Sequence, residues 1–364
     1  MHNKLVRQTA ALALAVCGIF SVFSQPVEAC TRALFTGPDN IVITARSMDW
    51  AEDMHSDLWV FPKGMKRDGA AGPRSIQWTS KYGSLIVSGY NLGTADGMNE
   101  KGLVTNLLYL AESDYGEPDS QTPLLSISLW AQYVLDNFST VTETVNALRK
   151  EPFGIIAPIL PNGAPAQLHL SIADATGDSA IFEYLGGKLV IHHGKQYTVM
   201  TNSPSFNKQL ALNAYWEEIG GLTFLPGTNR ASDRFARASF LLGAIPREIS
   251  RHYITAVPNK NYINQALASM MGVIRSVSVP LGISTPGQPN ISSTLWRTVS
   301  DHKNRVYFFD SATSPDTFWV ELDDLDFKEG APVKKLVASG GKIYSGNAAE
   351  HFEAAHPFTF LPAK

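Results

Sequence analysis

Short apolar runs separated by turn-forming residues dominate much of the chain, and this pattern predicts β-strands. The runs are rich in Val, Ile, Leu and aromatic residues and are bounded by Gly, Asp, Asn or Pro, which is typical of strands joined by tight turns. Four of them precede residue 111: "TRALF" at 31–35, "NIVITA" at 40–45, "SLIVSGY" at 84–90 and "GLVTNLLYL" at 102–110.

Two further regions predict antiparallel hairpins. Residues 168–202 contain strand-like runs interrupted at Ala175–Asp178, Gly186–Gly187 and Gly194–Lys195, where turn residues cluster. Residues 292–311 predict another hairpin that turns near 301–304. Consecutive hairpins favour antiparallel sheets.

Helical periodicity occurs in separate blocks rather than between successive strands. Ser139 and Thr140 form a helix-start signal before the second block. The predicted helices are Leu124–Leu135, Val141–Leu148, Ser205–Trp216, Ser232–Leu242 and Asn261–Met271. Because strands and helices are segregated, we expect an α+β fold rather than a doubly wound parallel sheet. We expect a single domain over residues 30–364.

The first 29 residues have the organisation of a secretory signal peptide. Lys4 and Arg7 precede an apolar stretch from Ala10 to Phe23, and "QPVEA" then ends in Ala29 with Val27 two positions earlier. The apolar stretch is short for a membrane span, which needs about 20 residues. We therefore predict cleavage after Ala29 and export, with an uncleaved N-terminal anchor as the alternative. No later stretch is apolar enough to predict a membrane span.

Composition, charge and missing motifs exclude several classes of function. The formal net charge is −3 and no basic stripe is present, which argues against nucleic acid as a partner. The chain has no HExxH, CxxC, GxGxxG or P-loop motif, so we predict no metal and no cofactor. Its two cysteines are Cys17, inside the leader, and Cys30, directly after the predicted cleavage site. A disulfide within the mature chain is therefore excluded.

Cleavage before Cys30 would place a thiol and a free α-amine on one residue. The ordinary pKa values are about 8.5 for a thiol and about 8 for an α-amine, so the amine can accept the thiol proton near neutral pH. This combination predicts an N-terminal nucleophile. The alternative is lipidation of Cys30, because "VEAC" is similar to a weak lipoprotein signal.

The hairpin after Cys30 gives a geometric expectation. A regular turn centred on Pro38 would place Arg46 directly opposite Cys30, with Asp49 and Trp50 just beyond it. The thiol would then face a cation, and a carboxylate would lie near the terminal ammonium. The alternative is a solvated pair between Arg46 and Asp49, which would contribute little.

Four ordered motifs resemble those of the choloylglycine hydrolase family of N-terminal nucleophile hydrolases, which includes penicillin V acylases and conjugated bile salt hydrolases. They are "CTRALF…RSMDW" from Cys30, "ADGMNEKGL" at 95–103, "VMTNSPSF" at 199–206 and "LPGTNRASDRFARASF" at 225–240. The resemblance implies a four-layer αββα fold and hydrolysis of a linear amide bond. Exported members belong to double-membraned bacteria, which implies a periplasmic location, and relatives are often tetramers.

The resemblance also assigns site residues. Cys30 would be the nucleophile, with Arg46 and Asp49 ordering its thiol and amine. Asn202 would donate its side-chain amide to the oxyanion, and Arg234 would hold the charge pattern of the site. The backbone N–H of Tyr109, ten residues after the asparagine of "MNEKG", would complete the oxyanion hole, and a tyrosine at this position favours the acylase side of the family.

The acyl group of an amide substrate needs an apolar pocket. We expect Trp50, Trp59, Phe61 and Tyr90 to form its walls, although each is also a common core residue type. Penicillin V is the first substrate expected. Conjugated bile salts and N-acyl homoserine lactones are the alternatives, and a lipidated binding protein anchored through Cys30 is the non-enzymatic one.

Overall fold

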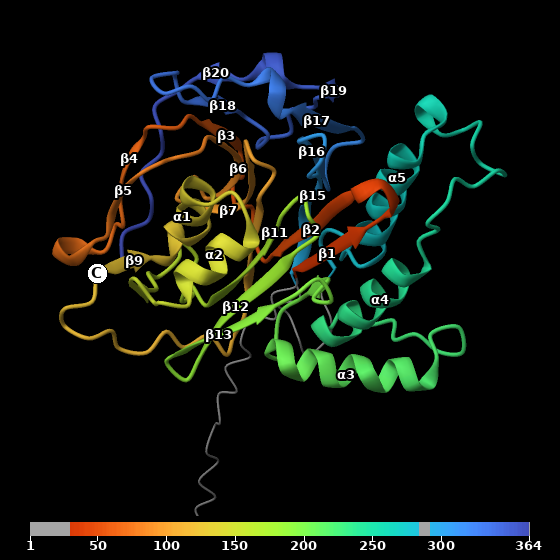
Figure 1. Cartoon of the computed structure of the whole chain (residues 1–364), viewed down its shortest axis with the longest axis horizontal. Helices are drawn as coiled ribbons and strands as arrows, with labels where there is room; N and C mark the ends of the chain where they lie inside the picture. Colours follow the sequence, from red (N-terminus) through yellow and green to blue (C-terminus); the bar gives the residue numbers. More distant parts are fainter. Residues whose placement is uncertain (1–29, 284–291, 364) are drawn as a thin grey trace, which may run out of the picture.

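The computed structural model describes residues 30–283 and 292–363, so the predicted signal peptide lies outside the described residues. Two β-sheets form the centre of the molecule, with helices on either side of the pair (Figure 1). No helix in these two ranges is both long and apolar enough to cross a membrane.

The first sheet contains the strand that begins directly after Cys30. Among the described residues it has seven strands, which are antiparallel apart from the last pair. In spatial order they are β14 (Val199–Met200), β1 (Thr31–Thr36), β2 (Val42–Trp50), β15 (Ser293–Asp301), β16 (Val306–Ser311), β17 (Thr317–Glu321) and β19 (Gly346–Asn347).

The second sheet is wholly antiparallel and has nine described strands. Their order is β13 (Lys188–His193), β12 (Ser179–Leu185), β11 (Leu168–Ala173), β8 (Val104–Tyr109), β7 (Gly93–Asn99), β6 (Ser84–Gly89), β3 (Leu58–Phe61), β18 (Lys334–Leu336) and β20 (Glu353–Ala354). Two small pairs lie beside it: β4 (Lys66–Asp68) with β5 (Gln77–Thr79), and β9 (Leu124–Ser126) with β10 (Gly154–Ile156).

The helices largely follow the predicted blocks. They are α1 (Trp130–Asn137), α2 (Val141–Leu148), α3 (Phe206–Ile219), α4 (Ala231–Ala244) and α5 (Tyr262–Ser276). Thr140 caps α2 by accepting a hydrogen bond from the Glu143 N–H, as its start signal predicts. The first predicted helix begins late, because residues 124–126 pair with β10 and Ile127–Leu129 form a 3₁₀ turn, η3.

The layers are α, β, β and α, as expected. α4 and α5 pack on β1, β2 and β15, whereas α1 and α2 pack on β7, β8 and β12 of the other sheet. β2 contacts β8 across the interface between the sheets. One large apolar cluster includes both sheets and Cys30, and a second one lies between the nine-stranded sheet and α1 and α2. The α+β prediction is confirmed.

Candidate active site

The β1–β2 hairpin has a different register from the predicted one. Arg46 lies opposite Arg32 and not opposite Cys30, because the turn is centred on Asp39. Asp39 and Asn40 both adopt positive φ angles, 55° and 58°, which lengthen the connection beyond the expected turn at Pro38. The register differs by two positions, and side chains alternate with a period of two. Arg46 therefore remains on the face of the sheet that carries Cys30.

The Cys30 thiol is buried next to the guanidinium of Arg46. Arg46 Nη2 lies 3.8 Å from Cys30 Sγ, and Met48 Sδ lies at the same distance. The backbone carbonyl of Asp49 is 3.7 Å from the sulfur. Burial raises the pKa of the Cys30 thiol, and the positive charge of Arg46 opposes this rise. A base is therefore needed to generate the thiolate.

Asn202 and Arg234 hold the backbone of Cys30. The Cys30 N–H donates to Asn202 Oδ1 at 2.5 Å, and Arg234 Nη1 donates to the Cys30 carbonyl at 2.6 Å. Arg234 Nη2 also donates to Asn202 Oδ1, at 2.9 Å. These bonds are possible because β14 pairs with β1 and brings Asn202, two residues past β14, beside Cys30. Arg234 lies in the first turn of α4 and is completely buried.

The amide of Asn202 has one orientation, because its oxygen accepts from two donors. Its Nδ2 donates to the Tyr109 carbonyl at 2.8 Å. A primary amide carries two N–H groups, so Nδ2 has a second hydrogen to donate. Tyr109 is the last residue of β8, and its ring lies edge-on to Trp50 with 6.4 Å between centroids. The structure thus places Tyr109 and Asn202 together beside Cys30.

Asp49 is buried next to the nucleophile. Its carboxylate accepts hydrogen bonds from Thr294 Oγ1 at 2.5 Å and from Ser47 Oγ at 3.4 Å. Burial raises the pKa of Asp49 to about 6, although the charge of Arg234 acts in the opposite direction. The bond between the carboxylate and a terminal ammonium remains a prediction, because Cys30 carries a free α-amine only after the predicted cleavage behind Ala29.

An apolar cavity opens beside the thiol. Its lining includes Cys30, Arg46, Trp50, Met54, Tyr90 and Tyr109. Trp50 and Tyr90 therefore lie where the sequence predicts a substrate wall. Trp50 Nε1 donates to Tyr90 Oη at 2.7 Å, and Tyr90 Oη donates to Glu52 Oε1 at 2.6 Å. The two rings are held in place at the wall of the cavity.

Comparison with known proteins agrees with this geometry. Residues 30–335 match the family described as linear amide C–N hydrolases, choloylglycine hydrolase family. The chain belongs to this family. It is therefore a linear amide C–N hydrolase, as the four motifs predict, and the match begins at Cys30.

Two similar proteins are penicillin V acylases. The one from Pectobacterium atrosepticum is 48 % identical over 377 aligned positions, which cover 99 % of this chain and 98 % of the relative. The solved structure of the one from Agrobacterium tumefaciens is 55 % identical and has a TM-score of 0.83, covering 92 % of this chain and 100 % of that chain. The fold is shared by a variant of conjugated bile acid hydrolase from Clostridium perfringens, which is 22 % identical to this chain. Its TM-score is 0.70, and the match covers 86 % of this chain and 98 % of that one.

Two of the predicted cavity residues of this hydrolase lie elsewhere. Trp59 and Phe61 are absent from the cavity wall and belong to the apolar cluster beneath α1 and α2. Leu58 and Val60 alternate with them along β3 and face the other cluster. Because successive residues of a strand point to opposite faces, Trp59 and Phe61 face away from the thiol. Their assignment as substrate-binding residues is therefore corrected.

Asp96 is a site residue that the sequence motifs did not single out, although it lies inside "ADGMNEKGL". Its carboxylate is 3.5 Å from Arg46 Nη1, and both side chains are fully buried. Tyr307 Oη and Asn106 Nδ2 donate to Asp96 at 2.5 and 2.7 Å. Arg46 also donates to the Leu107 carbonyl at 2.9 Å. These contacts orient the guanidinium that lies beside Cys30. The available signal was a charged residue inside an otherwise buried strand.

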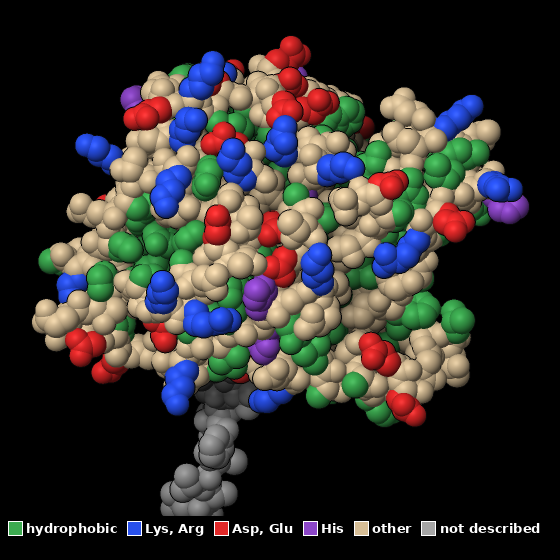
Figure 2. Space-filling model, viewed as in Figure 1, with side chains coloured by type: hydrophobic (Ala, Val, Ile, Leu, Met, Phe, Trp, Pro, Cys, Tyr) green, Lys and Arg blue, Asp and Glu red, His purple; other side chains and the backbone are tan. Residues whose placement is uncertain are grey.

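Charged groups elsewhere do not form a metal-ligand set. Within residues 30–283 and 292–363, no three His, Cys, Asp or Glu side chains are grouped as ligands for a metal ion. His192 and His193 are neighbours in β13, but they lie near different carboxylates, Glu183 at 3.7 Å from His192 and Asp178 at 2.8 Å from His193. On the face shown in Figure 2, Lys and Arg side chains are interspersed with Asp and Glu.

Proposed function

We propose that this protein is an exported penicillin V acylase-type enzyme whose nucleophile is the N-terminal Cys30 of the cleaved chain. One observation carries the proposal. The buried Cys30 sulfur lies beside Arg46 at the wall of an apolar cavity, and Asn202 and Arg234 hold the Cys30 backbone. A substrate whose acyl group fills this cavity would present its amide carbonyl to the sulfur.

The reaction would proceed by acyl transfer. The α-amine of Cys30 accepts the thiol proton, and Sγ attacks the amide carbonyl to form a carbon–sulfur bond. The resulting oxyanion accepts hydrogen bonds from Asn202 Nδ2 and the Tyr109 N–H. The protonated amine then gives its proton to the leaving nitrogen, the carbon–nitrogen bond breaks, and a thioester remains. Water hydrolyses the thioester with the same amine as base, which releases the acid and restores the thiol.

A phenoxyacetyl group suits the cavity. Aromatic rings pack favourably edge to face, and Trp50, Tyr90 and Tyr109 all line the wall. The names of the relatives from Pectobacterium and Agrobacterium support the same choice. Conjugated bile salts and N-acyl homoserine lactones are the alternatives. A kinetic panel of penicillin V, glycocholate and a long-chain acyl homoserine lactone distinguishes them, and the highest kcat/KM on glycocholate would contradict the acylase assignment.

The role of Cys30 has a direct test. The Cys30→Ser variant should lose nearly all amide hydrolysis, because a serine hydroxyl is a far weaker nucleophile near neutral pH. Circular dichroism and the unfolding transition should match those of the wild type, because the oxygen replaces sulfur with little change in volume. Full activity of the folded variant would refute the assignment.

Export and cleavage of residues 1–29 belong to the same proposal, with the periplasm as the location. Two observations support it: the family match begins at Cys30, and the alignment with the Pectobacterium relative covers nearly the whole chain, most of the leader included. The intact mass of the protein purified from the periplasm is the test. A free N-terminal cysteine is expected, whereas an added diacylglyceryl mass would favour the lipidated binding protein.

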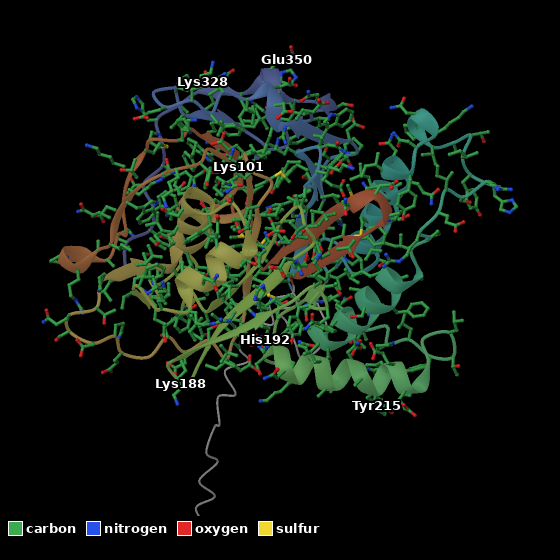
Figure 3. All side chains as sticks on the ribbon, viewed as in Figure 1. Lys101, Lys188, His192, Tyr215, Lys328 and Glu350 are labelled. Carbon is green, nitrogen blue, oxygen red and sulfur yellow. The ribbon has the colours of Figure 1, made fainter. Side chains whose placement is uncertain are left out.

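A homotetramer is proposed by analogy with the family. Large apolar side chains are exposed along α3 and the loop after it, which supports contacts with other copies there. Leu222 is 94 % exposed and Tyr215 is 61 % exposed, and Tyr215 points away from α3 in Figure 3. Light scattering should give a tetramer for the wild type and smaller species for Leu222→Ser. Exposed Ile343, on a different surface, provides the matched control as Ile343→Ser.

A further inference from the structure

Residues 355–363, called here the C-terminal segment, follow β20 and have no regular secondary structure. The segment runs from β20 past β4 and β5 and ends beside β9 (Figure 1). Backbone hydrogen bonds hold both of its ends: the Ala355 N–H donates to the Val333 carbonyl and the Ala363 N–H donates to the Ala70 carbonyl. The segment lies outside the residues that match the family, which end at 335.

Aromatic residues anchor the middle of this segment on β3. The ring of Phe358 lies 5.2 Å from Trp59 and 5.8 Å from Phe61, measured between centroids. Phe360 packs on Phe358 and on the guanidinium of Arg67. Trp59 and Phe61 do not reach the substrate cavity, but their rings hold the C-terminal segment against β3.

Leu361 brings the C-terminal segment to the substrate cavity. Its N–H donates to the Leu92 carbonyl at 2.7 Å, and its carbonyl accepts from Ser126 Oγ at 2.7 Å and Ser128 Oγ at 2.9 Å. Leu361 lines the same cavity as Cys30, together with Leu92 and Ser128. The backbone on both sides of its side chain is therefore fixed, and Leu361 has little freedom to withdraw from the cavity.

We propose that Leu361 is a specificity-determining residue that limits the size of the acyl group this hydrolase accepts. The inference rests on the proposed function, because it takes the cavity beside Cys30 as the acyl-binding site. An aliphatic side chain on the wall offers contact to a short aromatic acyl group and occupies the volume that a longer chain would need. Shortening Leu361 removes three carbon atoms from the wall and opens that volume to longer acyl chains.

Two amides of 6-aminopenicillanic acid test the inference, because they share one leaving group and differ only in the acyl group, phenoxyacetyl or decanoyl. In the cleaved enzyme, Leu361→Ala should raise the ratio of kcat/KM for the decanoyl amide to that for the phenoxyacetyl amide by at least about tenfold. Leu189→Ala is the matched control: Leu189 is a half-buried leucine that packs in the second apolar cluster and does not line the cavity. It should leave the ratio unchanged.

A binding measurement separates this inference from the identity of the nucleophile. Calorimetry with decanoate and phenoxyacetate on Cys30→Ser, and on Cys30→Ser combined with Leu361→Ala, needs no turnover. Preference for decanoate should increase only when Leu361 is shortened. The inference is overturned if Leu361→Ala leaves both the kinetic ratio and the binding preference at the values of the parent proteins, or if Leu189→Ala changes the kinetic ratio equally.

Discussion

Arg46 is expected to stabilise the Cys30 thiolate by a simple electrostatic effect, and Arg46→Gln tests this. The Nη2–Sγ distance of 3.8 Å corresponds to about 4 kcal/mol of thiolate stabilisation at an effective dielectric constant of about 20. That energy is equivalent to about a thousandfold change in the thiolate fraction near neutral pH. Loss of the charge also makes the thiolate more basic and therefore more nucleophilic, with a Brønsted coefficient of about 0.4–0.5. Alkylation of Cys30 in Arg46→Gln should therefore be roughly 30-fold slower than in the wild type.

The assay is alkylation of the cleaved protein by iodoacetamide, followed by intact mass, since Cys30 is the one cysteine outside the leader. The charge of Arg46 also compensates Asp96, and removal of one member of a buried pair destabilises a protein by about 3–5 kcal/mol. Disorder around the buried thiol would change its access to iodoacetamide, so Arg46→Gln alone does not isolate the electrostatic effect. The double variant Arg46→Gln with Asp96→Asn removes both charges and provides the control.

We expect the double variant to recover most of the free energy of unfolding that Arg46→Gln loses, because no uncompensated charge is left buried. Alkylation of Cys30 in the double variant should stay slow. If the double variant is stable and its thiol is alkylated as fast as that of the wild type, the electrostatic role of Arg46 is refuted, and the Arg46–Asp96 pair is purely structural.

Asn202→Ala should lower kcat by about 10²–10³-fold, because one proposed oxyanion donor is lost. Steady-state kinetics on penicillin V measure the loss, and an unchanged kcat would show that Asn202 is not an oxyanion donor. Glu183 gives a pH-dependent prediction. Burial raises the pKa of Glu183, but the His169 ring at 3.1 Å, the nearby His192 ring and the donating Phe206 N–H outweigh it and hold the pKa at about 2. Because the pKa of Glu183 is lower in the folded protein, its carboxylate stabilises the fold at pH values above the ordinary pKa of 4.5, by up to about 3 kcal/mol. This stabilisation is lost as the pH falls toward 2. Urea unfolding should therefore depend less on pH in Glu183→Gln over this range, and equal pH dependence in both proteins would contradict the assignment.

Much of the fold could be predicted because its signals are local. The hairpins of residues 168–202 depend on turn residues that lie between the strands they join, and Thr140 caps α2 from within its own turn. The position of Arg46 near Cys30 follows from a single hairpin. Its register could not be derived, because two residues with positive φ in the turn displaced the centre by one position.

The rest of the site depends on contacts between distant segments. Asn202 and Arg234 could be assigned only by resemblance, since their approach to Cys30 requires β14 to pair with β1 and α4 to pack on the same sheet. Trp59 and Phe61 were assigned wrongly because all four residues of β3 are buried. A strand buried on both faces has no polar alternation that would distinguish the cavity side from the core side.

The cavity joins the beginning and the end of the described chain, and this has a consequence for the order of folding. Cys30 and Leu361 line one space although almost the whole chain separates them. Contacts between such distant residues close the largest loops and are entropically costly to form early. The hairpin that carries Arg46 is local and can form while the C-terminal segment is still undocked. We therefore expect a late folding intermediate in which the thiol and its guanidinium are already adjacent and the acyl cavity is still open on the Leu361 side.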